Sequence, residues 1–157
     1  MLRRHPILSF ATFAYLAVVG WLTLGPQPLD DEGRGLLRRV IGWLQGHEPT
    51  AWVTYSGVEF TANVLMFVPV GLFFVLLLGR RRWWLAVVLC VALTIGIETT
   101  QLFLVDRIPD PRDLLSNSIG GVVGVFGALI ITWPKAHALR REAERADQAR
   151  PRERQLV

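Results

Sequence analysis

Charged residues and cysteine are both scarce in this sequence. Only 19% of the 157 residues are charged, against about 25% in a typical soluble domain, while 52% are hydrophobic and the mean hydropathy is +0.37. The single cysteine, Cys90, lies inside an apolar block, which excludes a disulfide framework and a thiolate metal cluster. The apolar excess excludes a disordered chain and argues against an ordinary soluble globule. The composition therefore indicates a small multi-pass membrane protein.

The apolar residues fall into four blocks, each close to the roughly 20 residues that an α-helix needs to cross a bilayer. The blocks cover residues 7–25, 60–79, 83–104 and 114–133. The first block is longer than the apolar core of a typical signal peptide, and no small-x-small cleavage site follows Leu24, so we interpret it as a span. We predict an all-α, four-helix transmembrane bundle over residues 1–133 and a charged cytoplasmic tail over residues 134–157.

The basic residues predict the orientation of these spans. Four spans place both chain ends on one side of the membrane, and twelve of the seventeen Lys and Arg flank that side. Because positive charge is retained in the cytoplasm, we expect both termini on the cytoplasmic side of the cell membrane. Residues 26–59 and 105–113 would then lie on the outer side. This distribution explains the net charge of +4 without a nucleic-acid partner, so we expect no nucleic-acid binding.

The first outer loop contains a helical pattern. Its apolar residues recur at helical spacing, and Arg34 and Arg38 lie one turn apart. The apolar positions are Leu36, Leu37, Val40, Ile41, Trp43 and Leu44. This pattern predicts a short helix that lies on the outer membrane surface and ends near Gly46. A solvated helix that caps the bundle is the alternative.

Polar residues inside the spans are the next signal. Glu98 is an ionisable residue in an apolar helix, where such residues are costly and by default suggest a function. Gln101 and Thr94 share its helix face at spacings of three and four. With a rise of about 1.5 Å per residue, Asn63 and Asn117 lie roughly 5 Å below the outer ends of their spans, and Glu98 and Gln101 about 9 and 5 Å below theirs. The sequence thus predicts a polar pocket in the outer leaflet.

The loop above this layer adds charge. It contributes Asp106, Arg107, Asp110, Arg112 and Asp113, and we expect Pro109 and Pro111 to hold it extended. Structural alternatives exist for single residues. Asp113 could cap the fourth helix, Asn63 and Asn117 could be interhelical hydrogen-bonding residues, and Glu98 could pair with Arg107 or Arg112.

Small residues in the fourth span form a G-x-x-x-G pair at Gly120 and Gly124. Such a pair lets another backbone approach closely. The approaching helix could be a neighbouring span of the same chain or, in a homo-oligomer, a span of another protomer.

The order and spacing of these polar and small residues resemble the pattern of the VanZ-like family. The resemblance runs over residues 60–128 and consists of Asn63-x3-Phe67-x-Pro69-x-Gly71, then Glu98-x2-Gln101, then Arg107-x2-Asp110-x2-Asp113-x3-Asn117-x2-Gly120, with Gly121 and Gly124. It implies a small multi-pass protein of the bacterial cytoplasmic membrane. The family is named after a member linked to teicoplanin resistance, and it has been grouped with four-helix proteins proposed to act on lipid head groups and lipid-linked saccharides.

Three functions fit these residues. In the first, an enzyme hydrolyses or transfers lipid head groups or lipid phosphates at the outer leaflet. Its catalytic residues would be Glu98, Asp110 and Asp113, and its substrate-binding residues Asn63, Gln101, Arg107, Arg112 and Asn117. We assign no metal or cofactor, although an oxygen-rich cluster could take Mg²⁺ or Ca²⁺. In the second, a non-catalytic protein binds or sequesters a lipid carrier, a cell-envelope precursor or an antibiotic. The third, an ion-coupled carrier that uses Glu98, ranks last.

Overall fold

The computed structural model describes residues 6–25, 31–104, 110–134, 141, 142 and 144, and all of the regular secondary structure in these residues is helical. The helices are α1 (Pro6–Leu24), α2 (Asp31–Gln45), η2 (Glu48–Thr50), α3 (Tyr55–Leu78), η3 (Arg80–Arg82), α4 (Trp83–Gln101) and α5 (Pro111–Ile131). Arg107 and most of the 134–157 tail lie outside the described residues.

Four of these helices are candidate membrane spans at the predicted positions. Helices α1, α3, α4 and α5 contain 19 to 24 residues and are apolar enough to cross a bilayer. Large apolar side chains point outward from them, for example Phe13, which is 60% exposed, and Ile130, which is 71% exposed. In water such exposure would be costly, whereas lipid tails solvate these side chains. The all-α class is confirmed, together with the short helix between the first and second spans.

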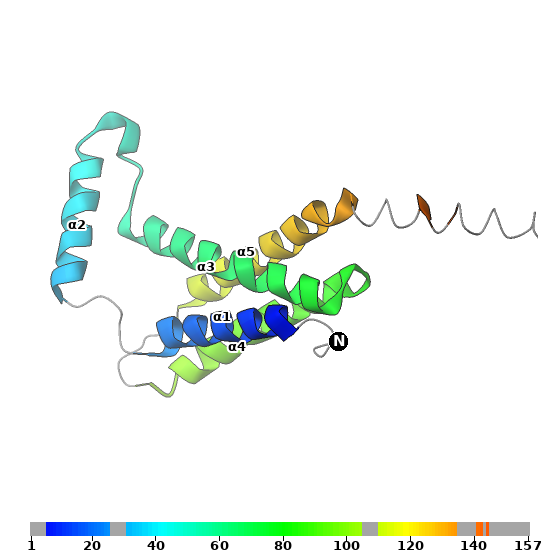
Figure 1. Cartoon of the computed structure of the whole chain (residues 1–157). Coiled ribbons are helices and arrows are strands. Elements are labelled where there is room, and N and C mark those ends of the chain that lie inside the picture. Colours follow the sequence, from blue (N-terminus) through cyan, green and yellow to red (C-terminus); the bar gives the residue numbers. More distant parts are fainter. Residues whose placement is uncertain (1–5, 26–30, 105–109, 135–140, 143, 145–157) are drawn as a thin grey trace, which may run out of the picture.

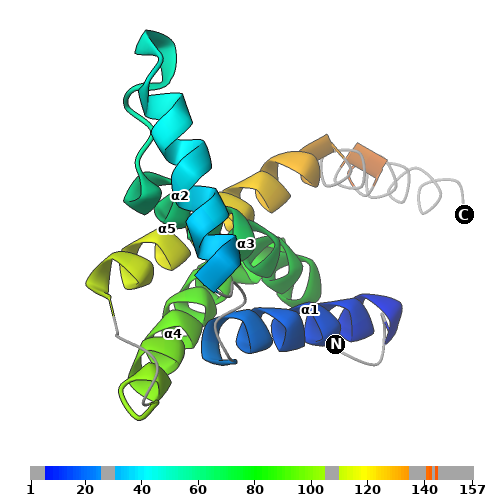
Figure 2. The ribbon, with the colours of Figure 1, turned by 90° about the vertical axis from the view of Figure 1, so that its left-hand side faces the viewer.

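The four long helices form one bundle that α2 crosses at its end. Figure 1 shows the start of α1, the η3 turn and the end of α5 at one end of the bundle. At the other end, α2 runs transverse to α1 in the view of Figure 1, and Figure 2 shows α2 in front of the bundle. Helices α3, α4 and α5 all contact one another, and α1 packs against α3 and α4.

Glycines set the distance between α3 and α5. A Cβ atom added at Gly120 would lie 2.2 Å from the carbonyl oxygen of Val64, and one at Gly124 would lie 1.9 Å from that of Val68. Both distances are too short for any side chain, so the two backbones touch. The G-x-x-x-G face of α5 is therefore occupied by α3 of the same chain, and a homo-oligomer stays a prediction.

Hydrogen bonds tie α1 to its neighbours. The Tyr15 hydroxyl donates to the carbonyl oxygen of Met66 in α3 at 2.8 Å. Gln101 at the end of α4 donates from Nε2 to the carbonyl oxygen of Thr23 at 2.9 Å. The last four carbonyls of a helix have no partner within the helix, so Gln101 satisfies one of these carbonyls in α1.

The fifth helix begins at Pro111, so residues 111–113 are helical and not part of the predicted extended loop, whose residues 105–109 lie outside the described part of the chain. The side chain of Asp110 accepts a hydrogen bond from the Arg112 N–H at 2.9 Å. Proline suits the first helical position because its missing N–H has no helical partner there. Asp110, and not Asp113, is therefore the N-cap of this helix.

Candidate functional site

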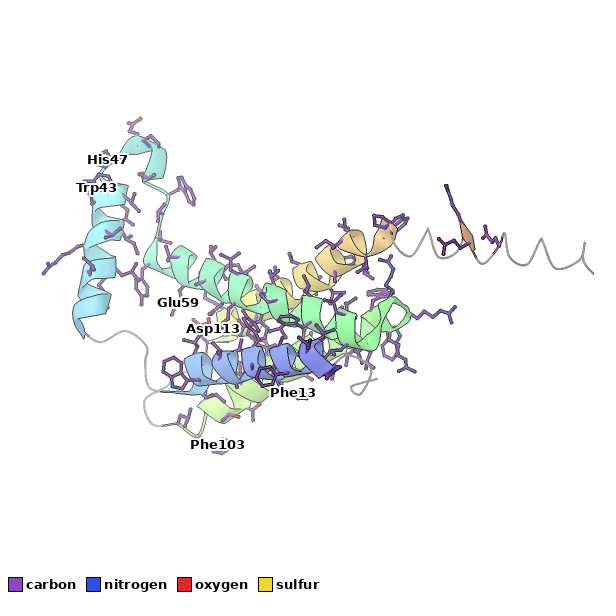
Figure 3. The ribbon with its side chains drawn as sticks, in the orientation of Figure 1. Phe13, Trp43, His47, Glu59, Phe103 and Asp113 are labelled. Atoms are coloured by element: carbon purple, nitrogen blue, oxygen red, sulfur yellow. The ribbon has the colours of Figure 1, made fainter. Side chains whose placement is uncertain are left out.

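Polar side chains gather where α3, α4 and α5 meet, near the end of the bundle that α2 crosses. Figure 3 labels two of them, Glu59 and Asp113, toward this end. We define the polar cluster as Glu59 and Asn63 of α3, Thr94 and Glu98 of α4, and Asp110, Asp113 and Asn117 around the start of α5.

Asn63 and Asp113 join α3 to α5 within this cluster. The Asn63 amide donates from Nδ2 to Oδ1 of Asp113 at 2.7 Å, and both residues are half-buried. Ser116 donates to the backbone carbonyl of Asp113 at 3.1 Å and so stays on the same turn. The carboxylate of Asp113 thus faces α3, so Asp113 is not simply the cap of α5.

Asn117 joins α5 to α4 one turn deeper. Its Nδ2 donates to the Thr94 hydroxyl at 3.2 Å, and the residue is only 2% exposed. Its Oδ1 is buried and has no hydrogen-bond partner among the described residues. Buried amide oxygens are nearly always paired, so this oxygen requires an explanation.

Glu98 lies one helical turn from Thr94 on the same face of α4. Its carboxylate is close enough to Asp113, to Asp110 and to the Asp110 backbone N–H to interact with each of them. One of its oxygens, Oε1, is buried and lacks a partner in the described part of the chain. Two buried acceptor oxygens, Glu98 Oε1 and Asn117 Oδ1, are therefore unsatisfied in one cluster.

The sequence interpretation missed Glu59 and Ser56. Glu59 is exposed at the edge of the cluster and within electrostatic range of Asp110, Asp113 and Arg112. Ser56 accepts a hydrogen bond from the Arg112 guanidinium. The signal was present in the spacing, because residues 56, 59 and 63 share one face of α3. It was overlooked because the predicted span began only at residue 60, whereas the Thr54 side chain caps α3 and starts it at Tyr55.

Among the other expected site residues, the side chains of Gln101 and Arg112 are hydrogen-bonded to partners outside the cluster. Gln101 is turned toward α1, where its amide donates to the Thr23 carbonyl. Arg112 is exposed and directed at Ser56, and Arg107 falls outside the described residues. Of the expected residues, the structure brings together Asn63, Glu98, Asp110, Asp113 and Asn117.

The charge of the cluster is acidic. Among the described residues it holds four carboxylates, Glu59, Glu98, Asp110 and Asp113, with the guanidinium of Arg112 at its rim. In the described part of the chain, no three His, Cys, Asp or Glu side chains are grouped so that they could hold a metal ion. The described residues of the cluster therefore offer mainly carboxylate acceptors and negative charge.

The chain matches a known protein family. The model of the VanZ/LLP1 family matches residues 12–132, which include the four long helices except the first turns of α1. No curated protein and no solved structure matched the chain. With four candidate membrane spans in or overlapping the matched region, the chain is a multi-pass membrane protein that belongs to the VanZ/LLP1 family.

Proposed function

We propose that this protein lies in the bacterial cytoplasmic membrane with both termini in the cytoplasm, and that its polar cluster binds or acts on lipid head groups or lipid-linked cell-envelope precursors. The orientation is supported by the excess of Lys and Arg on one side. With this orientation, the polar cluster would lie at the level of the outer head groups. A role in glycopeptide resistance of the teicoplanin type rests on the family resemblance.

The observation that carries this proposal is the pair of unsatisfied oxygens on Glu98 and Asn117. Both are buried, and both come from helices that are long and apolar enough to cross the membrane. An unpaired polar group in a membrane protein is expensive, and ionisable residues in spans mark binding sites and pathways. A head group that enters between α4 and α5 would supply the missing donors.

The catalytic version of this proposal assigns proton transfer to Glu98. A carboxyl group can act as general acid or base when it lies against the reacting atom. Asp113 or Asp110 would be the second carboxylate, while Asn63 and Asn117 orient the head group. The polar cluster, as defined by its described residues, includes no Ser, Cys or His nucleophile, so water or a carboxylate would attack.

Purified wild-type protein and the Glu98→Gln variant, incubated with bacterial lipid extract and polyprenyl phosphates, test this version. Glu48→Gln is the matched control, because Glu48 is exposed in η2 and outside the polar cluster. A product formed by wild type and the control but not by Glu98→Gln supports an enzyme. Retention of lipid without turnover would favour the non-catalytic binding protein, and absence of both would refute the proposal.

Helix α2 is proposed to lie on the outer membrane surface. Its apolar side chains Leu36 and Trp43 are 62% and 66% exposed, and Val40 lies between them on the same face. Arg38 and Arg39 are also exposed. The transverse position of α2 at the bundle end suits a basic amphipathic helix in the head-group layer.

Fluorescent labels on α2 distinguish this position from a solvated helix. We would label Val40→Cys on the apolar face and Gln45→Cys elsewhere on the helix, then add lipid-borne quenchers. The native Cys90 is fully buried. Quenching at position 40 well above that at position 45 supports the surface position, whereas equal, weak quenching at both positions would exclude it.

A further inference from the structure

We propose that the polar cluster receives an ammonium group, the protonated primary amine of a lipid head group. This inference rests on the proposed function and names the chemical class of its ligand. Its basis is the pair of acceptor oxygens, Glu98 Oε1 and Asn117 Oδ1, with further carboxylates beside them.

The orientation of Asn117 determines which kind of group can bind. Its amide nitrogen donates to the Thr94 hydroxyl of α4, so the oxygen is left to accept. Glu98, one turn from Thr94, contributes a second acceptor. A ligand at this point must therefore donate hydrogen bonds. A phosphate ester offers only acceptors there, whereas an ammonium group has three donors.

The surrounding charge favours the same group. Asp113 and Asp110 interact with the Glu98 carboxylate, and Glu59 extends the acidic surface to the rim. The Arg112 guanidinium is exposed and bonded to Ser56, and neither unsatisfied oxygen accepts a hydrogen bond from it. Opposite charges attract strongly where water is scarce, so the carboxylates of the described residues favour a cation over an anion.

A metal ion is the competing cation, and the geometry disfavours it. Metal sites need several oxygen ligands at about 2.0 to 2.6 Å from one point. The carboxylates of the described residues do not form such a group. An ammonium group accepts longer N···O distances, about 2.7 to 2.9 Å, and can bridge acceptors on neighbouring helices.

The test compares lipids with matched acyl chains and different head groups. Purified full-length protein is mixed with vesicles of phosphatidylethanolamine, phosphatidylcholine or phosphatidylglycerol, and the co-purified lipid is measured by mass spectrometry. We expect phosphatidylethanolamine to be retained about tenfold over the other two, since neither offers an N–H donor. Soluble ethanolamine in a parallel arm shows whether the amine suffices without a lipid tail.

Three variants probe the cluster, and a fourth is the control. Glu98→Gln and Asn117→Leu should abolish the preference, and the control Glu48→Gln should leave it unchanged. Glu59→Gln covers the case in which the buried variants do not fold, because Glu59 is exposed. It should lower the preference a few fold by removing one negative charge.

The outcomes separate this inference from the proposed function. Retention of phosphatidylglycerol or a polyprenyl phosphate that depends on Glu98 would overturn the amine inference and leave head-group binding intact. Equal retention of all lipids, independent of Glu98, would refute both the amine inference and the proposed head-group binding. If the Asn117 amide instead turns so that its Nδ2 donates to Glu98, the two residues satisfy each other. The protein would then show no amine preference, which also overturns the inference.

Discussion

Asn63 and Asp113 are fifty positions apart in the sequence, yet the amide of one donates a 2.7 Å hydrogen bond to the carboxylate of the other. This bond joins α3 to α5 at the level of the polar cluster. It orients the Asp113 carboxylate within electrostatic range of Glu98. The place of the Asp113 carboxylate in the cluster thus depends on a contact between two helices that are separated by a third in the chain.

A double-mutant cycle measures this bond. We expect Asn63→Ala and Asp113→Ala each to lower the free energy of unfolding in detergent, with a coupling of about 0.6 kcal/mol, the average for polar pairs within membranes, and at most about 1.7 kcal/mol. Thermal unfolding of the four proteins gives the coupling. A value near zero would mean that the bond does not hold α3 to α5.

Glycine substitutions on α5 test the contact with α3. A Cβ at Gly124 would lie 1.9 Å from the Val68 carbonyl oxygen, so Gly124→Ala should destabilise the protein by about 1–3 kcal/mol or prevent folding. Gly127→Ala is the matched control on the same helix, because no described atom lies within 4 Å of its added Cβ. Equal melting temperatures for the two variants would contradict the close approach.

A substitution of Gln101 tests whether this residue has a structural role or binds the ligand. Because its amide satisfies the Thr23 carbonyl, Gln101→Leu should lower stability by about 1–3 kcal/mol, the cost of leaving a buried acceptor unpaired. Lipid retention per folded molecule should not change. Loss of lipid retention at unchanged stability would instead show that Gln101 takes part in lipid binding.

The orientation can be measured by labelling single cysteines in intact cells. Gln45 ends α2 and Arg81 lies in η3, and both are exposed. Helix α2 and the η3 turn lie at opposite ends of the bundle (Figure 1). A membrane-impermeant maleimide should label Gln45→Cys and leave Arg81→Cys unlabelled until the cells are opened. A reporter fused after Val157 should be cytoplasmic. The reverse pattern would move the polar cluster to the inner leaflet.

Local patterns predicted the elements well because their causes lie within one segment. Long apolar runs give the four helices that can cross a membrane, and helical spacing around Val40 gives α2. The start of α5 differs from the prediction, because Pro111 is the first helical residue behind the Asp110 cap and does not break the helix. The start of α3 at Tyr55 precedes the predicted residue 60, because the polar first turns of α3, which include Glu59, lie outside the apolar run.

The sequence by itself predicted four helices apolar enough to cross a membrane and a few polar residues inside them, because hydropathy and helical rise act along one helix. Only the tertiary structure decided how the helices are rotated against one another. The glycines at positions 120 and 124 let α5 sit directly on α3, and that contact sets Asp113 against Asn63. The same packing turns Gln101 toward α1 and leaves oxygens of Glu98 and Asn117 without partners among the described residues.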